Sequence, residues 1–273
     1  MIKVNDKVVE INKFPDGTPR IILNIDEIEE YEFDGSYCFL IEWFYENNDE
    51  LFYLLLVKKH LERYFTNVNY YLHMPYVPNA RMDRTKNDDE VFTLKYFCDF
   101  INSLNFASVY VLDAHSNVST ALLNNCVNEN PKEYIDGVIE EINDPNLVLF
   151  FPDEGSMKRY SDMFELPYAF GLKKRDWKTG QIQGLDIIDN GIDLKGKNIL
   201  IADDICSRGG TFYHSAKKLK EFGVGNIYLY VTHCENTILE GEVLTSGLIE
   251  RVFTTNSLFG GEHDKIRVID IDY

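Results

Sequence analysis

Residues 198–212, NILIADDICSRGGTF, hold the residue types with the clearest chemistry in the chain. Apolar residues 199–202 predict a buried strand, with Asp203 and Asp204 at its carboxyl end. A tight turn into a helix is predicted just beyond them, at Ser207, Arg208, Gly209, Gly210 and Thr211. The N–H groups of such a turn and of the helix that follows favour a phosphate. Paired carboxylates suit ribose hydroxyls and can help to hold Mg²⁺.

This segment differs from two common nucleotide-binding loops. No Lys follows the glycines, as it would in a Walker loop, and the acidic residues precede the glycines, unlike those of a Rossmann fingerprint. The plain alternative is a strand, turn and helix with a solvated acidic turn. The combination of strand, Asp-Asp and Gly-Gly-Thr favours a phosphate-binding loop.

Alternating strands and helices must position this loop. Apolar runs predict strands at 107–112, 147–151, 198–202, 226–231 and 251–255. Helical patterns occur at 49–65, 88–104, 155–164, 210–222 and 236–246. The alternation favours α/β architecture, with mainly parallel sheets, helices on both faces and ligands at the carboxyl ends of the strands. We expect a domain boundary within the polar stretch 125–145, and divide the chain into domains 1–130 and 131–273.

Composition limits the classes of function. The chain has 273 residues, which suits two domains, and a formal net charge of −18, which argues against a nucleic-acid partner. Its five cysteines are scattered, as expected for a reducing compartment. The first residues lack a signal-peptide pattern, and the apolar run 51–57 is too short to span a bilayer. We therefore expect a cytoplasmic protein without a membrane partner.

Residues 198–212 resemble the phosphoribosyl-pyrophosphate (PRPP) motif of type I phosphoribosyltransferases and ribose-phosphate pyrophosphokinases. Further segments resemble pyrophosphokinase motifs in family order, namely FPDG at 14–17, MPYVPNARMDR at 74–84, DAHS at 113–116, FPDEGSMKR at 151–159, KKR at 173–175 and VIDI at 268–271. The chain is similar to a short, divergent member of that family. The resemblance implies two phosphoribosyltransferase-like domains, the first with an ATP site and the second with the ribose-phosphate loop.

The resemblance also implies a reaction. The family transfers the β,γ-diphosphoryl group of ATP to the 1-hydroxyl of ribose 5-phosphate, which gives PRPP and AMP. Mg²⁺ is the implied cofactor, with His115 and Asp153 holding the ion associated with ATP. Because Mg²⁺ prefers oxygen ligands, contact of His115 through water is an open alternative. Lys173 and Arg175 match the catalytic flexible loop and would, with His115, form the catalytic group by stabilising charge on the transferred phosphates.

Arg81 and Asp83 match ATP-site positions of the family, with Asp83 expected to orient Arg81. Phe14 and Asp16 match residues that reach the adenine of ATP bound by a neighbouring subunit, so a homo-oligomer, either dimer or hexamer, is expected. A core position for Phe14 is the alternative. Three residues depart from the family pattern: Met82 replaces Gln, Thr18 replaces Glu, and Arg208 stands where Thr is common.

Arg208 leaves the acceptor open. An added cation at the loop suits a more highly phosphorylated acceptor, and ADP-ribose would then give a pyrophosphate from which NAD could be rebuilt. In the simpler alternative Arg208 points to solvent or pairs with Asp204 or Glu154, and the acceptor is ribose 5-phosphate. Two further alternatives are a phosphoribosyltransferase that consumes PRPP and a catalytically silent regulatory relative.

Overall fold

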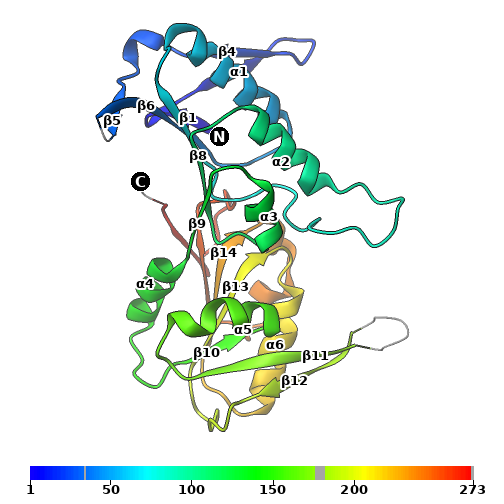
Figure 1. Ribbon diagram of the computed structural model, residues 1–273. Helices are drawn as coiled ribbons and strands as arrows, with labels where there is room; N and C mark the ends of the chain where they lie inside the picture. The colour runs from blue at the N-terminus through cyan, green and yellow to red at the C-terminus, as the bar shows by residue number, and fades with distance from the viewer. Residues whose placement is uncertain (34, 176–181, 272–273) are drawn as a thin grey trace. The chain divides into compact units, whose positions relative to one another are not determined.

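The computed structural model describes residues 1–33, 35–175 and 182–271, and side chains for all of these except residues 33, 173–175 and 182–185. The chain divides into two compact units, Met1–Asn130 and Pro131–Tyr273. Each unit is built on its own seven-stranded sheet (Figure 1).

The first unit's sheet runs in the order β2-β1-β6-β7-β8-β9, with β5 also paired to β6. Strands β6 to β9 are mutually parallel, whereas β1, β2 and β5 join antiparallel. The bounds are β1 Ile2–Val4, β2 Lys7–Val8, β5 Tyr31–Phe33, β6 Ser36–Trp43, β7 Asn69–His73, β8 Ser108–Leu112 and β9 Cys126–Glu129. Three helices accompany the sheet, α1 Asp49–Tyr64, α2 Thr93–Ser103 and α3 Asn117–Leu122.

One hydrophobic core holds this unit together. On β6, Phe39, Ile41 and Trp43 alternate toward it and are fully buried. Leu54 and Leu61 bring the apolar face of α1 against the same core. A separate two-stranded hairpin, β3 Glu10–Lys13 and β4 Pro19–Ile22, precedes the 3₁₀ helix η1 Ile25–Glu27.

The second unit's sheet runs in the order β12-β11-β10-β13-β14-β15-β16 and is parallel except for the β11–β12 pair. Its strands are β10 Val148–Phe151, β11 Tyr168–Arg175, β12 Ile182–Ile188, β13 Ile199–Cys206, β14 Ile227–Cys234, β15 Arg251–Thr255 and β16 Ile266–Ile269. Its helical segments are α4 Lys132–Ile142, α5 Glu154–Tyr160, η2 Ser161–Met163, α6 Gly210–Glu221, η3 Asn236–Glu240 and α7 Glu242–Thr245.

The central strand β13 contributes to two hydrophobic clusters. Ile199 and Ile201 pack with α6, while Leu200 and Ala202 pack with α4 and with Tyr160 of α5. Because successive side chains on a strand point to opposite faces, these two clusters lie on the two sides of the sheet. Burial on both faces explains why residues 199–202 are all apolar instead of alternating with polar residues.

The predicted fold class is confirmed, since both sheets are mainly parallel and are accompanied by helices. Some expected elements were wrong in detail. The helix predicted at 88–104 begins only at Thr93, and the segment 236–246 is a 3₁₀ turn followed by the short α7. The polar stretch 125–145 contains β9 and α4, and the sequence analysis missed both, although Ile135, Val138 and Ile142 of α4 recur at helical spacing.

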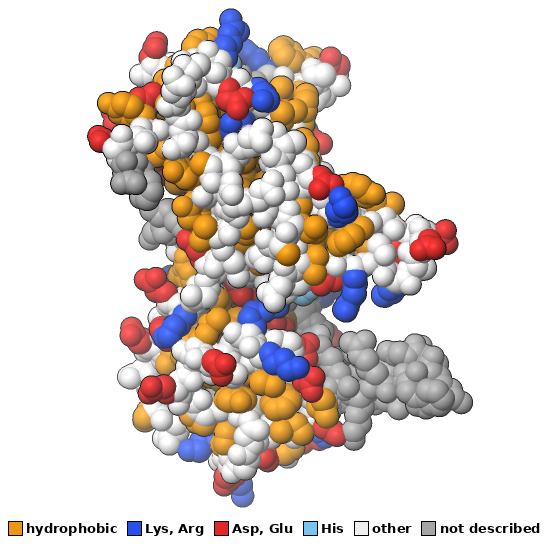
Figure 2. Space-filling view, viewed as in Figure 1, with side chains coloured by type: hydrophobic (Ala, Val, Ile, Leu, Met, Phe, Trp, Pro, Cys, Tyr) orange, Lys and Arg blue, Asp and Glu red, His pale blue; other side chains and the backbone are white. Residues whose placement is uncertain are grey.

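Two surface properties bear on partners. Among the described residues no helix combines the length and the apolar character that crossing a bilayer requires. On the face shown in Figure 2, basic side chains are interspersed with acidic ones, in keeping with the net charge of −18.

Candidate active site

The carboxyl end of β13 carries the two acidic residues identified in the sequence. The backbone N–H of Asp204 donates to Oδ1 of Asp203 over 3.1 Å. Strand alternation places Asp204 on the same face as Leu200 and Ala202, beside α5, and Asp203 on the opposite face. Asp204 is buried and Asp203 half-buried.

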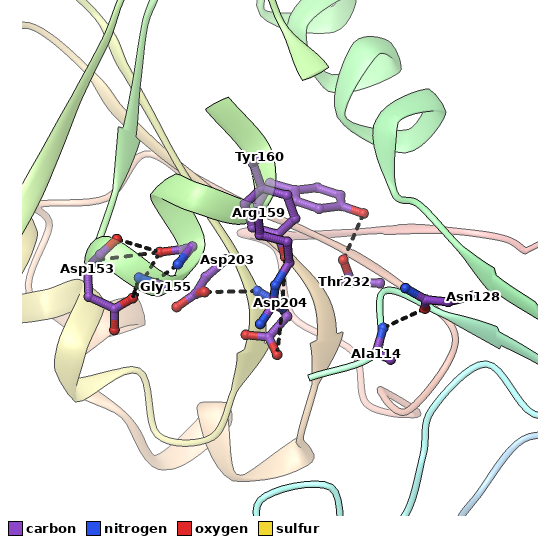
Figure 3. Close-up of polar contacts among 11 residues, drawn as sticks. Ala114, Asn128, Asp153, Gly155, Arg159, Tyr160, Asp203, Asp204 and Thr232 are labelled. Carbon is purple, nitrogen blue, oxygen red and sulfur yellow. Dashed lines mark hydrogen bonds and ion pairs between the residues drawn. The ribbon is translucent and has the colours of Figure 1, made fainter. Parts of the chain in front are cut away.

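Asp153 lies at the neighbouring strand end and caps α5. Its Oδ1 accepts from the backbone N–H groups of Gly155 at 2.9 Å and Ser156 at 3.1 Å, and Ser156 completes a capping box (Figure 3). The cap satisfies donors that the helix itself leaves unpaired. It also fixes how α5 starts, and therefore where its later side chains lie.

Three carboxylates thus come together at the ends of β10 and β13. Burial, and then the neighbouring carboxylates of Asp204 and Asp153, raise the pKa of Asp203 well above its ordinary value. A cluster of three carboxylates favours the binding of a cation or of hydroxyl groups that donate hydrogen bonds. Among the described residues, no three His, Cys, Asp or Glu side chains are arranged to hold a metal ion. The donor set still fits Mg²⁺, which usually takes one or two carboxylates together with substrate phosphates and water.

The predicted phosphate loop closes into α6 through Gly209, whose φ of 74° is left-handed. An L side chain there would be strained, and a Cβ would stand 2.7 Å from the Val243 side chain. Behind the loop, a Cβ on Gly241 would meet the Arg208 carbonyl oxygen at 2.0 Å. The short segment between β14 and α7 therefore packs directly against the loop backbone.

Carboxylates of that segment engage the loop side chains. The Ser207 hydroxyl donates to Glu235 Oε2 at 2.7 Å, and the Thr237 hydroxyl reaches the same oxygen at 3.2 Å. The exposed Arg208 pairs with Glu240 at 2.8 Å. The expectation that Arg208 points to solvent is confirmed by its side-chain exposure of 71%, whereas the expected partners Asp204 and Glu154 were wrong, because the pair forms with Glu240 of η3.

Asp204 pairs instead with Arg159 of α5, whose Nη1 lies 3.1 Å from its Oδ2. Sequence reasoning gave no role to Arg159, Glu235, Glu240 or Gly241. Arg159 is the last residue of the FPDEGSMKR segment, and this was the only signal for it. The other three lie in a stretch that matches no motif.

In the first unit, His115 follows β8 in a turn held by the neighbouring strand end. Asp113 adopts a left-handed φ of 45°, and its N–H donates to the Glu129 carbonyl at 2.8 Å. The N–H of Ala114 donates to Asn128 Oδ1 at 2.9 Å. His115 is half-buried at this edge. His115 and Asp153 belong to different units, so their shared metal site stays a prediction.

The predicted ATP-site residues lie on exposed or half-buried turns. Phe14 is 51% exposed at the tip of the β3–β4 hairpin, so the alternative of a core position was wrong. Beside it, Asp16 Oδ1 accepts from the N–H and hydroxyl of Thr18 at 3.0 and 2.7 Å, which lowers the pKa of Asp16. Thr18 therefore positions Asp16.

Arg81 is exposed and Asp83 half-buried in the turn after β7. The carboxylate of Asp83 lies 3.6 Å from Arg84, and the expected contact with Arg81 stays a prediction. The predicted catalytic residues Lys173 and Arg175 end strand β11, and their side chains lie outside the described part of the structure.

Known proteins similar to this chain agree with one another. The ribose-phosphate pyrophosphokinase of Thermococcus kodakarensis is 30% identical over 252 residues, which cover 89% of this chain and 81% of that protein. The Bacillus subtilis protein of the same name is 26% identical, covering 94% and 79%. Phosphoribosylpyrophosphate synthetase from Mycobacterium smegmatis has a similar fold, with a TM-score of 0.73 at 19% identity over 96% of this chain and 86% of that one. No family model matches the chain.

Proposed function

Because the chain belongs to the ribose-phosphate pyrophosphokinase family, we propose that it transfers the β,γ-diphosphoryl group of ATP to the 1-hydroxyl of ribose 5-phosphate. The products are PRPP and AMP. The observation that carries this proposal is the similarity over 89% of the chain to a protein of that name, together with an acidic pair and a glycine loop at one strand end. The relatives give no support to ADP-ribose as acceptor or to a silent regulatory role.

The second unit supplies the acceptor site. The carboxylates of Asp203 and Asp204 accept hydrogen bonds from the ribose 2- and 3-hydroxyls. The N–H groups of the loop 207–211 and the Thr211 hydroxyl hold the 5-phosphate at the start of α6. The Ser207 hydroxyl, which donates to Glu235 in this structure, turns to the phosphate when the acceptor binds. Contacts at both ends of the sugar orient its 1-hydroxyl for in-line attack on the β-phosphorus of ATP.

The first unit supplies the ATP site in this proposal. Arg81 contacts the phosphates, and Phe14 and Asp16 present an aromatic face and an acceptor to the adenine of ATP on a neighbouring copy. The exposure of Phe14 at the hairpin tip supports this role. An aromatic ring on a surface turn is exposed to water, and stacking of a base on it removes that apolar surface from water. The proposal therefore includes a homo-oligomer.

Mg²⁺ is the proposed cofactor, held through Asp153 and His115, and it would neutralise charge on the β- and γ-phosphates. Lys173 and Arg175 add donors for the charge that develops on the transferred group. The cytoplasmic location stays a prediction.

The test is incubation of the purified protein with Mg²⁺, ATP and ribose 5-phosphate, with the nucleotides separated chromatographically and the sugar product followed by ³¹P NMR. We expect AMP and PRPP in equal amounts. Formation of ADP and ribose 1,5-bisphosphate, the products of γ-phosphoryl transfer, would refute the proposed transfer. Asp203→Asn with Asp204→Asn serves as the inactive control, and ADP-ribose replaces ribose 5-phosphate in a parallel reaction.

A further inference from the structure

Arg159 brings a positive charge to the three carboxylates of the acceptor site. Its Nη1 lies 3.1 Å from Asp204 Oδ2, and the two side chains are 26% and 5% exposed. Because the Asp204 carboxylate is buried and Arg159 is largely covered, this ion pair is screened less by water and keeps one geometry better than a pair of exposed side chains. The contact therefore bears on where the Asp204 carboxylate lies.

The guanidinium is itself held on a rigid support. Its Nη1 lies 3.5 Å from the Tyr160 hydroxyl, and its Cζ lies 5.6 Å from the centre of that ring. Tyr160 is fully buried and packs against Phe151 of β10 at a centroid distance of 6.1 Å. Figure 3 shows Arg159 and Tyr160 side by side above Asp204.

The start of α5 sets the same geometry from the other end. The Asp153 capping box fixes the first turn of a helix of only seven residues, so Arg159 sits a fixed distance along it. Asp204 faces α5 because strand alternation puts it on the Leu200 and Ala202 side of β13. The Arg159–Asp204 ion pair thus adds a polar contact to the apolar packing of Tyr160 of α5 against Leu200 and Ala202 of β13.

We propose that Arg159 is a positioning residue for the acceptor: it holds the Asp204 carboxylate in the orientation that accepts the ribose hydroxyls. This inference rests on the proposed function. Without Arg159, the buried carboxylate of Asp204 lies beside the carboxylates of Asp203 and Asp153 with no cation from α5. Repulsion between the like charges then turns it away from them, or a counter-ion binds. Ribose 5-phosphate binding then weakens, whereas ATP binding does not depend on this contact.

The experiment compares Arg159→Ala and Arg159→Lys with the wild type in steady-state kinetics and in calorimetric titration with ribose 5-phosphate. Losing one charged hydrogen bond predicts a ~10–100-fold rise in the KM for ribose 5-phosphate in the Ala variant. We expect the KM for ATP to change less than about twofold and the Lys variant to recover part of the loss. Lys218→Ala, which removes the cation of a surface pair with Glu221 in α6, is the matched control and should behave as wild type.

A double-mutant cycle separates positioning from a general loss of structure. In an Asp204→Asn background, Arg159→Ala should add little to the KM for ribose 5-phosphate, because the group it positions is already altered. Full additivity, or equal rises in both KM values, would overturn the proposal. An unchanged KM for ribose 5-phosphate in a folded Arg159→Ala variant would do the same. Failure of the wild type to make PRPP would instead refute the proposed function, and the calorimetric titration still reports on Arg159.

Discussion

Gly241 allows the phosphate loop to lie where it does. Its φ of −91° and ψ of 149° are open to any residue, so the glycine is required for space and not for backbone conformation. A Cβ at this position would stand 2.0 Å from the Arg208 carbonyl oxygen, 3.0 Å from the Arg208 carbonyl carbon and 3.1 Å from the Ile238 carbonyl oxygen. These are backbone atoms, which cannot turn aside as a flexible side chain can. Gly241→Ala must therefore move the loop or η3.

The size of the effect follows from that overlap. Ordinary contacts between carbon atoms lie at about 3.5–4.0 Å, whereas the Cβ would stand 2.0 Å from the Arg208 oxygen, so the backbone must move by about 1.5 Å. Overpacking of this kind costs about 1–3 kcal/mol of folding free energy. A shift of ~1 Å in residues that position a substrate can cost up to ~10²-fold in catalysis. We expect Gly241→Ala to raise the KM for ribose 5-phosphate at least tenfold, roughly 1.4 kcal/mol, and to lower the melting temperature.

The assay is thermal unfolding by calorimetry together with steady-state kinetics for both substrates. Gly137→Ala is the matched control, because a Cβ at Gly137 of α4 meets no atom within 4 Å and Ala favours a helix. The control should melt at or slightly above the wild-type temperature, with unchanged kinetics. If Gly241→Ala melts with the wild type and keeps its KM for ribose 5-phosphate, the loop is not packed against Gly241 and the reasoning is refuted.

Three more predictions concern charge. Lys173→Ala and Arg175→Ala should each lower kcat ~10²–10³-fold with little change in either KM, since they stabilise charge that develops in the transition state; a normal kcat in rapid-quench assays would exclude them. Asp203→Asn should stabilise the Mg²⁺-free protein at pH 7.5 while weakening ribose 5-phosphate binding. Because the pKa of Asp203 is raised in the folded protein, the folded state binds a proton more tightly at this carboxyl than the unfolded chain does. The free energy of unfolding therefore falls as pH rises above the ordinary aspartate range. An Asp203→Asn variant less stable than the wild type in urea unfolding would contradict this. Burial of His73 lowers its pKa to about 3, so the unfolded chain alone takes up a proton below about pH 6.5. Stability should then fall from pH 7.5 to pH 5, and His73→Gln should flatten that dependence; parallel curves would show that His73 is not the cause.

The local chemistry of the acceptor site could be predicted from the sequence. A buried strand, an acidic pair and a glycine turn into a helix are all encoded within residues 198–212, because strand burial, turn geometry and helix initiation depend on neighbours in the chain. Asp153 was identified in the sequence only as a metal ligand implied by the resemblance, and its role as the cap of α5 came from the structure. The ordered motif set then identified the family, which the comparisons confirmed.

Contacts between distant segments were decided only by the tertiary structure. Arg159 and Asp204 are 45 positions apart, and their pairing depends on which face of β13 helix α5 covers. Glu240 reaches Arg208 only because η3 returns beneath the loop, where Gly241 leaves room for the backbone. Each of these contacts arises from packing between elements, and packing is a property of three-dimensional arrangement that no short window of residues contains.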